Sequence, residues 1–223
     1  MDFFHGDIPV NVVFEKRKTL SMTFDHDGVL NISAPSKMSM EEVRLFVEKH
    51  KRWVRTHYVK LKGKAEHYVK ISVEEGGTVM YLGEVLKVRI GEKNKVLKIG
   101  DEMFFPEGAG MEDYFKWLKG GAKEYLTRRL DTKAYEAGIS FSKLKITSAT
   151  TRWGSCNENG VISLSWRLMM CPKEAIDYVL IHELCHRIHM DHSEEFWEEV
   201  EKRMPDYRVQ KKWLDDHSYL MEI

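Results

Sequence analysis

Four histidines and one glutamate lie within eleven residues near the C-terminal end of the sequence, in the segment HELCHRIHMDH at 182–192. His182 and His186 are four residues apart, so on a helix their side chains leave the same face one turn apart. This is the spacing at which two imidazoles bind one Zn²⁺. Glu183 lies about 100° further round the helix. A carboxylate there can accept a proton from water on the metal, so the segment predicts a hydrolytic metal site with Glu183 as general base.

A catalytic zinc usually has three protein ligands and one open position, so a third ligand is expected after His186. His192 follows six residues later, beyond the expected helix end near Met190, where a chain that turns back brings it to the metal. His189 would lie about 10.5 Å along the helix axis from His182, at a different level, which makes it an outer residue. The alternative third ligand is an acid of the next helix: Glu195, Glu198 or Glu199.

The pattern along the chain predicts an α+β fold in two parts. The first part, residues 1–108, is β-rich. Apolar and polar residues alternate at 10–17, 20–35 and 78–106, as in half-buried strands. A single helix is expected from Ser39, which can cap it, to about Tyr58.

The second part, residues 109–223, is predicted to position the histidines. A long helix from about Met111 to about Ala137 precedes a β-hairpin, whose strands are 143–153 and 161–168. Pro172 then opens an apolar, buried helix that carries the His-Glu-x-x-His motif. Two shorter helices follow, the first of them capped by Ser193.

Composition excludes several classes of protein. The 223 residues contain 35 basic and 35 acidic side chains, so no overall field draws the chain to nucleic acid, and there is no strong nucleic-acid signal. No apolar run approaches the roughly 20 residues of a membrane span, and the first residues lack the pattern of a signal peptide. The three cysteines cannot all pair, which favours free thiols and a cytoplasmic setting: Cys156, Cys171 and Cys185.

The motifs between residues 150 and 200 resemble those of the YgjP-like family, zincin-type metallopeptidase-like proteins distantly related to the SprT-like and WLM metalloproteases. The likeness is carried by RWGSC, SLSWRL, IDYVLIHELCH, DHS and FW, and DGVLNISAP, RWV and YLGEVLKV extend it over nearly the whole chain. It implies a zincin-like zinc hydrolase fold for residues 109–223, with a hairpin sheet, an active-site helix and C-terminal helices. It also favours His192 over the acids as third ligand.

Two positions depart from the family pattern. Ser165 stands where the family has asparagine, and Asp191 replaces the asparagine before the third histidine. Neither change removes a ligand or the base, but Ser165 puts a substrate contact from its strand in doubt. The resemblance names no substrate.

Three functions fit these residues. The favoured one is a peptidase with one Zn²⁺ per chain, in which a strand edge at 145–153 or 161–167 pairs with an extended peptide. The second is a metal-dependent nucleoside triphosphate phosphohydrolase, with phosphates held by Arg152, Arg167 and the basic stretch between Lys49 and Lys70. The third is an interaction domain held together by zinc. The open position and Glu183 disfavour it, because structural zinc sites use four protein ligands.

Overall fold

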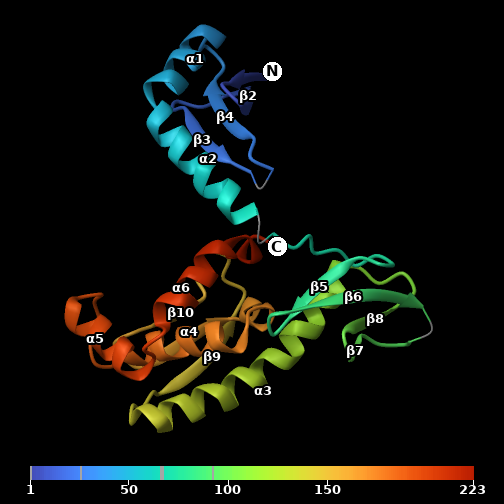
Figure 1. The fold of residues 1–223 in the computed structure, drawn as a ribbon, viewed down its shortest axis with the longest axis vertical. Coiled ribbons are helices and arrows are strands. Elements are labelled where there is room, and N and C mark those ends of the chain that lie inside the picture. Colours follow the sequence, from blue (N-terminus) through green and yellow to red (C-terminus); the bar gives the residue numbers. More distant parts are fainter. Residues whose placement is uncertain (1, 26, 66–67, 92) are drawn as a thin grey trace. The chain divides into compact units, whose positions relative to one another are not determined.

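The structure, a computed structural model, describes residues 2–25, 27–65, 68–91 and 93–223 (Figure 1). It divides into two compact units, Met1–Tyr68 and Val69–Ile223. The described residues form six α-helices, two short 3₁₀ helices and three small sheets, which confirms the predicted α+β class. None of the helices in these ranges combines the length and the apolar character needed to cross a membrane.

The first unit is a four-stranded sheet with two helices. Its strands are β1 (Asp2–His5), β2 (Ile8–Glu15), β3 (Ser21–Phe24) and β4 (Leu30–Pro35), in the order β1-β2-β4-β3. The central pair, β2 and β4, is parallel. Alternate residues of these two strands are buried against Val43 and Val47 of α1 and Val54 of α2, as the period of two in the sequence requires.

The single helix expected between Ser39 and Tyr58 is two helices, α1 (Met40–Lys49) and α2 (Lys51–Ala65). Ser39 caps α1 as predicted, in a capping box with Glu42. The break lies at His50, whose φ of −103° and ψ of 15° are not helical. Its imidazole Nδ1 bonds the Phe46 carbonyl at 2.8 Å, and this local bond competes with the helical ladder.

The second unit begins with another four-stranded sheet, ordered β5-β6-β8-β7. Its strands are β5 (Thr78–Tyr81), β6 (Glu84–Gly91), β7 (Leu97–Ile99) and β8 (Glu102–Pro106). The β5–β6 turn is bonded to a later part of the chain, because the amides of Leu82 and Gly83 donate to the carbonyls of Met169 and Met170 at 2.8 and 3.2 Å. Met80 of β5 is joined through its amide to the Tyr114 hydroxyl at 3.2 Å.

These contacts explain why the division of the chain differs from the expected one. A boundary at 108/109 would separate β5–β8 from the residues to which that sheet is bonded. The apolar residues of this sheet, such as Val79 and Phe105, share one core with Ile162, Leu164 and Leu180. The unit boundary therefore falls after Tyr68, and the sheet belongs with the histidine-bearing part.

The three-stranded sheet has the order β10-β11-β9. Its strands are β9 (Lys143–Thr147), β10 (Gly154–Cys156) and β11 (Val161–Ser165). The expected hairpin of 143–153 with 161–168 is therefore wrong in its first strand, because β9 runs parallel to β11 and the antiparallel partner is β10. Chain beyond Ser165 turns into the 3₁₀ helix η1 (Trp166–Met170), where the side chain of Ser165 accepts from the Arg167 amide.

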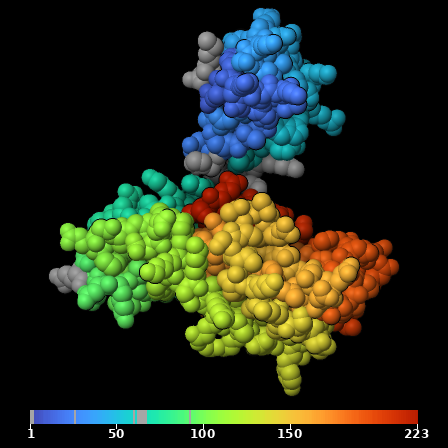
Figure 2. All heavy atoms as spheres, turned by 180° about the vertical axis from the view of Figure 1, so that it is seen from behind, coloured from blue at the N-terminus to red at the C-terminus, as the bar shows by residue number. Residues whose placement is uncertain are grey.

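Four helices complete this unit: α3 (Met111–Ala137), α4 (Lys173–Cys185), α5 (Glu194–Arg203) and α6 (Tyr207–Asp216), with the 3₁₀ helix η2 (Ser218–Met221) after them. The bounds of α3 are those predicted, and Gly138 ends it in the left-handed conformation that glycine favours. Residues of α3 and β9, yellow-green to yellow in the space-filling view, cover much of one face of this unit (Figure 2).

Candidate metal centre

Helix α4 positions the His-Glu-x-x-His motif. It is apolar on nearly every side, and its residues Ala175 to Ile181 are all buried. It is fixed to α3 by an ion pair in which the Arg129 guanidinium donates to both carboxylate oxygens of Asp177, at 2.6 and 2.7 Å. The helix ends at Cys185, with His186 as its C-cap. His182 is thus held on a buried helix, the kind of element that can fix the position of a side chain for metal binding.

Three imidazoles converge at the C-terminal end of α4. One ring nitrogen from each of His182, His186 and His192 lies within 4.8 Å of the others. The Nε2 atoms of His182 and His192 are 3.2 Å apart. Two nitrogens bound at about 2.0–2.1 Å to one tetrahedral zinc would be about 3.3 Å apart, so the observed spacing fits a shared metal ion.

The chain between α4 and α5 brings His192 back to this point. Ser193 caps α5, accepting from the Phe196 amide at 3.4 Å as predicted. Phe196 is fully buried and contacts all three imidazoles, with ring centroids at 4.5 Å from His186, 4.9 Å from His182 and 5.0 Å from His192. Phe196 is therefore the apolar side chain against which all three imidazoles pack.

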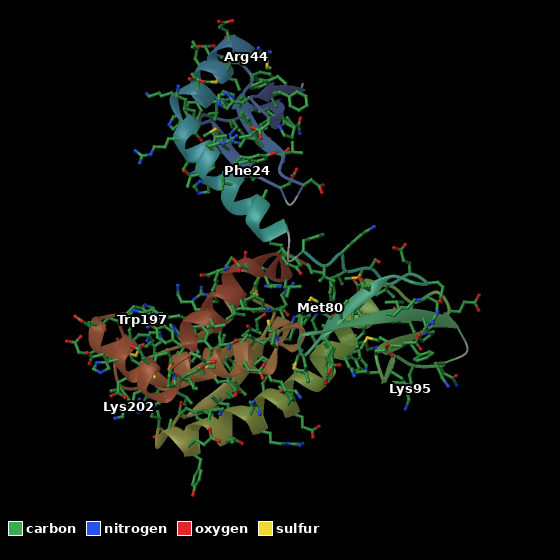
Figure 3. The ribbon with its side chains drawn as sticks, in the orientation of Figure 1. Phe24, Arg44, Met80, Lys95, Trp197 and Lys202 are labelled. Carbon is green, nitrogen blue, oxygen red and sulfur yellow. The ribbon has the colours of Figure 1, made fainter. Side chains whose placement is uncertain are left out.

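A second aromatic layer supports the cluster. The Trp197 ring, labelled in Figure 3, lies 5.8 Å from the rings of both His182 and His192. It stacks on Tyr207 at 5.4 Å, and Tyr207 stacks on Tyr178 at 6.2 Å. The stack joins α5, α6 and α4 around the histidines.

The remaining ring nitrogens differ in their partners. Nδ1 of His186 lies 3.0 Å from the His189 carbonyl oxygen. If Nδ1 carries the proton and donates there, Nε2 is left as a free acceptor, the usual arrangement of a metal-binding histidine. His189 thus contacts His186 through its main chain and is not one of the three converging imidazoles. Nδ1 of His182 is buried and has no hydrogen-bond partner among the described residues.

Burial sets the charge of these histidines. It lowers the pKa of His182 to about 3, with smaller contributions from His186 and His192. Burial also lowers the pKa of His186, although its bond to His189 acts in the opposite direction. Both rings are therefore neutral at neutral pH, the state in which an imidazole can donate a lone pair to a metal.

Glu183 lies beside the three-histidine cluster in a buried position, against the first residue of β10. A Cβ on Gly154 would stand 2.7 Å from Oε1 of Glu183, so only glycine allows this approach. Oε2 of Glu183 is buried with no hydrogen-bond partner in the described part of the chain. Burial raises the pKa of Glu183 to about 8, and the charge of Arg152 acts against that shift. A cation at the cluster would favour the carboxylate form further.

The two arginines singled out in the sequence have different places. Arg152 lies at a cavity that Glu183 and His182 also line. Arg167 is 8 % exposed, and its guanidinium donates to the carbonyl oxygens of Ser148 at 3.2 Å and Ile223 at 2.6 Å. Its donors are engaged within the fold, so the structure does not bring Arg167 to Glu183.

The acids considered as third ligands do not join the cluster. Glu199 pairs with Arg203 one turn further along α5, and Glu195 and Glu198 are exposed. Two residues of the site, Tyr178 and Gly154, were not predicted from the sequence as site residues. Tyr178 precedes His182 by one helical turn, a spacing that could have indicated it. The approach of Gly154 to Glu183 is a long-range contact that left no local signal.

Two side chains at the end of a buried helix, His182 and Glu183, lie with the imidazoles of His186 and His192 from the following chain within an α+β fold. Three imidazoles beside a buried carboxyl group are the arrangement of a metal-dependent hydrolase. The family model described as YgjP-like, metallopeptidase domain, matches residues 18–217. The chain therefore belongs to the YgjP-like family, and it is a hydrolase of the metallopeptidase class with a metal cofactor.

Among solved structures, the chain is similar to the metallopeptidase zymogen of Pyrococcus abyssi abylysin. The identity is 26 %, and the match covers 39 % of this chain and 93 % of that one. The TM-score of 0.34 is too low to relate the two folds. Comparison with curated proteins gives no match.

Proposed function

We propose that the protein is a zinc-dependent peptidase in which His182, His186 and His192 hold the metal and Glu183 is the general base. The observation that carries this proposal is the convergence of three ligand nitrogens within 4.8 Å beside a buried carboxylate oxygen that has no partner among the described residues. A buried, unsatisfied acceptor costs stability, so its presence beside three imidazoles favours a role in chemistry.

The donor set favours zinc. Three imidazoles without a carboxylate suit zinc, nickel or copper, and zinc is the most available of these. Three protein ligands also leave a fourth position open, as in catalytic zinc sites. When bound there, zinc would supply Lewis-acid polarisation of a substrate carbonyl and would activate water.

Glu183 moves the proton. It would accept a proton from the attacking water and deliver it to the leaving amine, and this step requires the carboxylate form at the start. The charge of Arg152 and of the metal both favour that form over the protonated one. Gly154 presses against the carboxyl group and so limits the positions that the base can occupy.

Strand β10 offers a place for an extended peptide. It is an edge strand that pairs only with β11 among the described residues, so one side of its backbone is free to bond an added strand. Its first residue, Gly154, contacts Glu183. A peptide lying along this edge would pass the base directly.

The nucleotide alternative has less support. Arg167, one of its two proposed phosphate-binding arginines, is engaged by Ser148 and Ile223. The basic stretch from Lys49 to Lys70 gives no argument, because the side chains at 60 and 62–67 lie outside the described residues, Glu66 among them.

The test uses zinc-loaded protein against a quenched fluorescent peptide library and a nucleoside triphosphate panel, with chelator-treated protein as control. We expect metal-dependent cleavage of peptides and no release of phosphate. Cleavage of nucleotides alone would overturn the peptidase proposal, and equal activity after removal of the metal would overturn the role of the histidines.

A further inference from the structure

A cavity of about 250 Å³ adjoins His182 and Glu183 on the side of α4 that faces α6. Its apolar walls come from three separate elements. Val179 lies on α4, Leu214 on α6, and Trp153 immediately before β10. Cavities that enclose a whole drug-sized ligand measure about 300–1,000 Å³. This one is smaller, and its size suits one large apolar side chain.

The edge of the cavity carries charged side chains. Lys211 and Asp215, both on α6, face each other at 3.7 Å and offset one another. Arg152 is exposed and forms no ion pair within the described ranges of the chain. The charge of Arg152 favours the ionised form of Glu183, which lines the same cavity, but no hydrogen bond or ion pair joins these two described residues. The guanidinium donors of Arg152 are therefore available, and arginine is the side chain best suited to bind a carboxylate with two bonds.

Tyr178 adds a second donor. Tyr178 is only 6 % exposed and lines the same cavity, and its ring lies 5.8 Å from the ring of His182. The hydroxyl makes no hydrogen bond to any described residue and is not among the buried polar atoms that lack a partner, so it is accessible to a ligand. An apolar cavity with a few converging polar groups is the usual form of a ligand site, and the Tyr178 hydroxyl can donate a hydrogen bond to an acceptor there.

We propose that this cavity selects substrates that combine a large apolar side chain, seated between Val179, Leu214 and Trp153, with a neighbouring carboxylate bound by Arg152 and Tyr178. The inference deepens the proposed peptidase function and rests on it. The carboxylate has two sources with the same chemistry, an acidic side chain or the C-terminus of the peptide. Either would give the enzyme a preference that Glu183 and the metal alone do not supply.

The test compares three matched peptides that share one phenylalanine. The first has glutamate after phenylalanine and an amidated C-terminus, the second has glutamine in place of glutamate, and the third ends after phenylalanine in a free carboxylate. Cleavage by zinc-loaded wild-type protein gives kcat/KM for each. We expect the glutamate peptide or the free-carboxylate peptide to exceed the glutamine peptide by about 10- to 100-fold, the range expected for hydrogen bonds to a charged group.

A binding measurement separates this inference from the peptidase proposal. The same peptides are titrated into zinc-loaded Glu183→Gln protein, and the indole NMR signal of Trp153, assigned with Trp153→Phe, reports occupation of the cavity. Arg152→Gln should bring the affinities of the charged and neutral peptides within twofold of each other. Arg128→Gln, which changes an exposed arginine of α3 paired with Glu124, should leave the preference unchanged.

Each result decides one of the two proposals. Equal binding of the charged and neutral peptides, or a preference that survives Arg152→Gln, overturns the carboxylate site. Preferential binding that needs Arg152, without cleavage of any peptide by the zinc-loaded wild type, overturns the peptidase function and leaves the site standing. Leu214→Phe, which fills the cavity, should weaken binding of all three peptides, and unchanged affinity would overturn the seat for the apolar side chain.

Discussion

Asp177 and Glu183 are two carboxyl groups on the same helix, six residues apart and almost equally buried, at 9 % and 4 % exposure. Both oxygens of Asp177 accept from Arg129, and Lys133 lies 3.6 Å away. Glu183 has an oxygen without any hydrogen-bond partner in the described structure. The comparison teaches that burial alone does not identify a functional acid. The partners do, because a satisfied carboxylate holds the fold together and an unsatisfied one is free to exchange a proton.

The largest effect is expected from His182→Ala, which removes a ligand from the Glu183 end of α4. The protein should lose its bound metal. Loss of a residue that only hydrogen-bonds a ligand lowers metal affinity by about 10- to 100-fold, and we expect a larger fall here. Metal analysis after gel filtration measures this. His189→Ala is the matched control, since the carbonyl that faces His186 remains. A full equivalent of metal in His182→Ala would place the site elsewhere.

Glu183→Gln should lower turnover by about 10²–10⁴-fold, the usual contribution of a general base. The amide keeps the size of the side chain but does not accept the proton, so metal content and the free energy of unfolding should remain close to wild type. Peptide hydrolysis and metal analysis of the same preparation check both statements. Normal turnover would remove Glu183 from the mechanism, whereas loss of metal would make it a ligand.

Asp177→Asn tests the other carboxyl group and should act on stability alone. Breaking a buried ion pair costs about 3–5 kcal/mol. Because the Arg129 side chain is 35 % exposed, we expect a loss of about 2 kcal/mol here. Urea unfolding followed by circular dichroism measures it. Turnover per folded molecule should stay within a few-fold of wild type, and a loss comparable to that of Glu183→Gln would abolish the contrast between the two acids.

The last expected effect appears only without metal and is a pH dependence of the stability of the metal-free protein. The folded pKa of Glu183 is raised from 4.5 to about 8, so the folded state holds a proton that the unfolded state releases between these values. Its contribution to stability is complete below pH 4.5 and is lost as pH rises towards 8, at up to about 1.4 kcal/mol per pH unit. Metal-free Glu183→Gln should lack this loss. If the free energy of unfolding changes with pH in the same way in both proteins across that range, Glu183 does not hold a proton in the folded state.

Local signals in the sequence were enough to predict several features. The capping box at Ser39, the bounds of α3 and the cap at Ser193 each depend on residues within one turn of one another. The approach of His192 to His182 follows from helix geometry and a short loop. In each case the determining interactions join residues close in sequence.

Long-range pairings could not be predicted in this way. The parallel pairing of β9 with β11 and the bonds from Leu82 to Met169 join distant segments whose local patterns also fit other partners. The Arg129–Asp177 pair spans 48 residues. An isolated acid in a helix pattern gives no sign of whether such a partner exists, so the difference between Asp177 and Glu183 emerges only in the folded chain.

The contact between Gly154 and Glu183 has a consequence for disorder at the Glu183 carboxyl group. A side chain in the place of Gly154 would exchange among rotamers, and fixing one rotamer would cost conformational entropy. Glycine has no side-chain torsion to fix, so its contribution to that cost is zero. Oε1 faces the main chain of Gly154, where an added Cβ would stand 2.7 Å from that oxygen. This main chain is already ordered by its pairing with β11. The Glu183 carboxyl group therefore faces a boundary whose position does not fluctuate between rotamers.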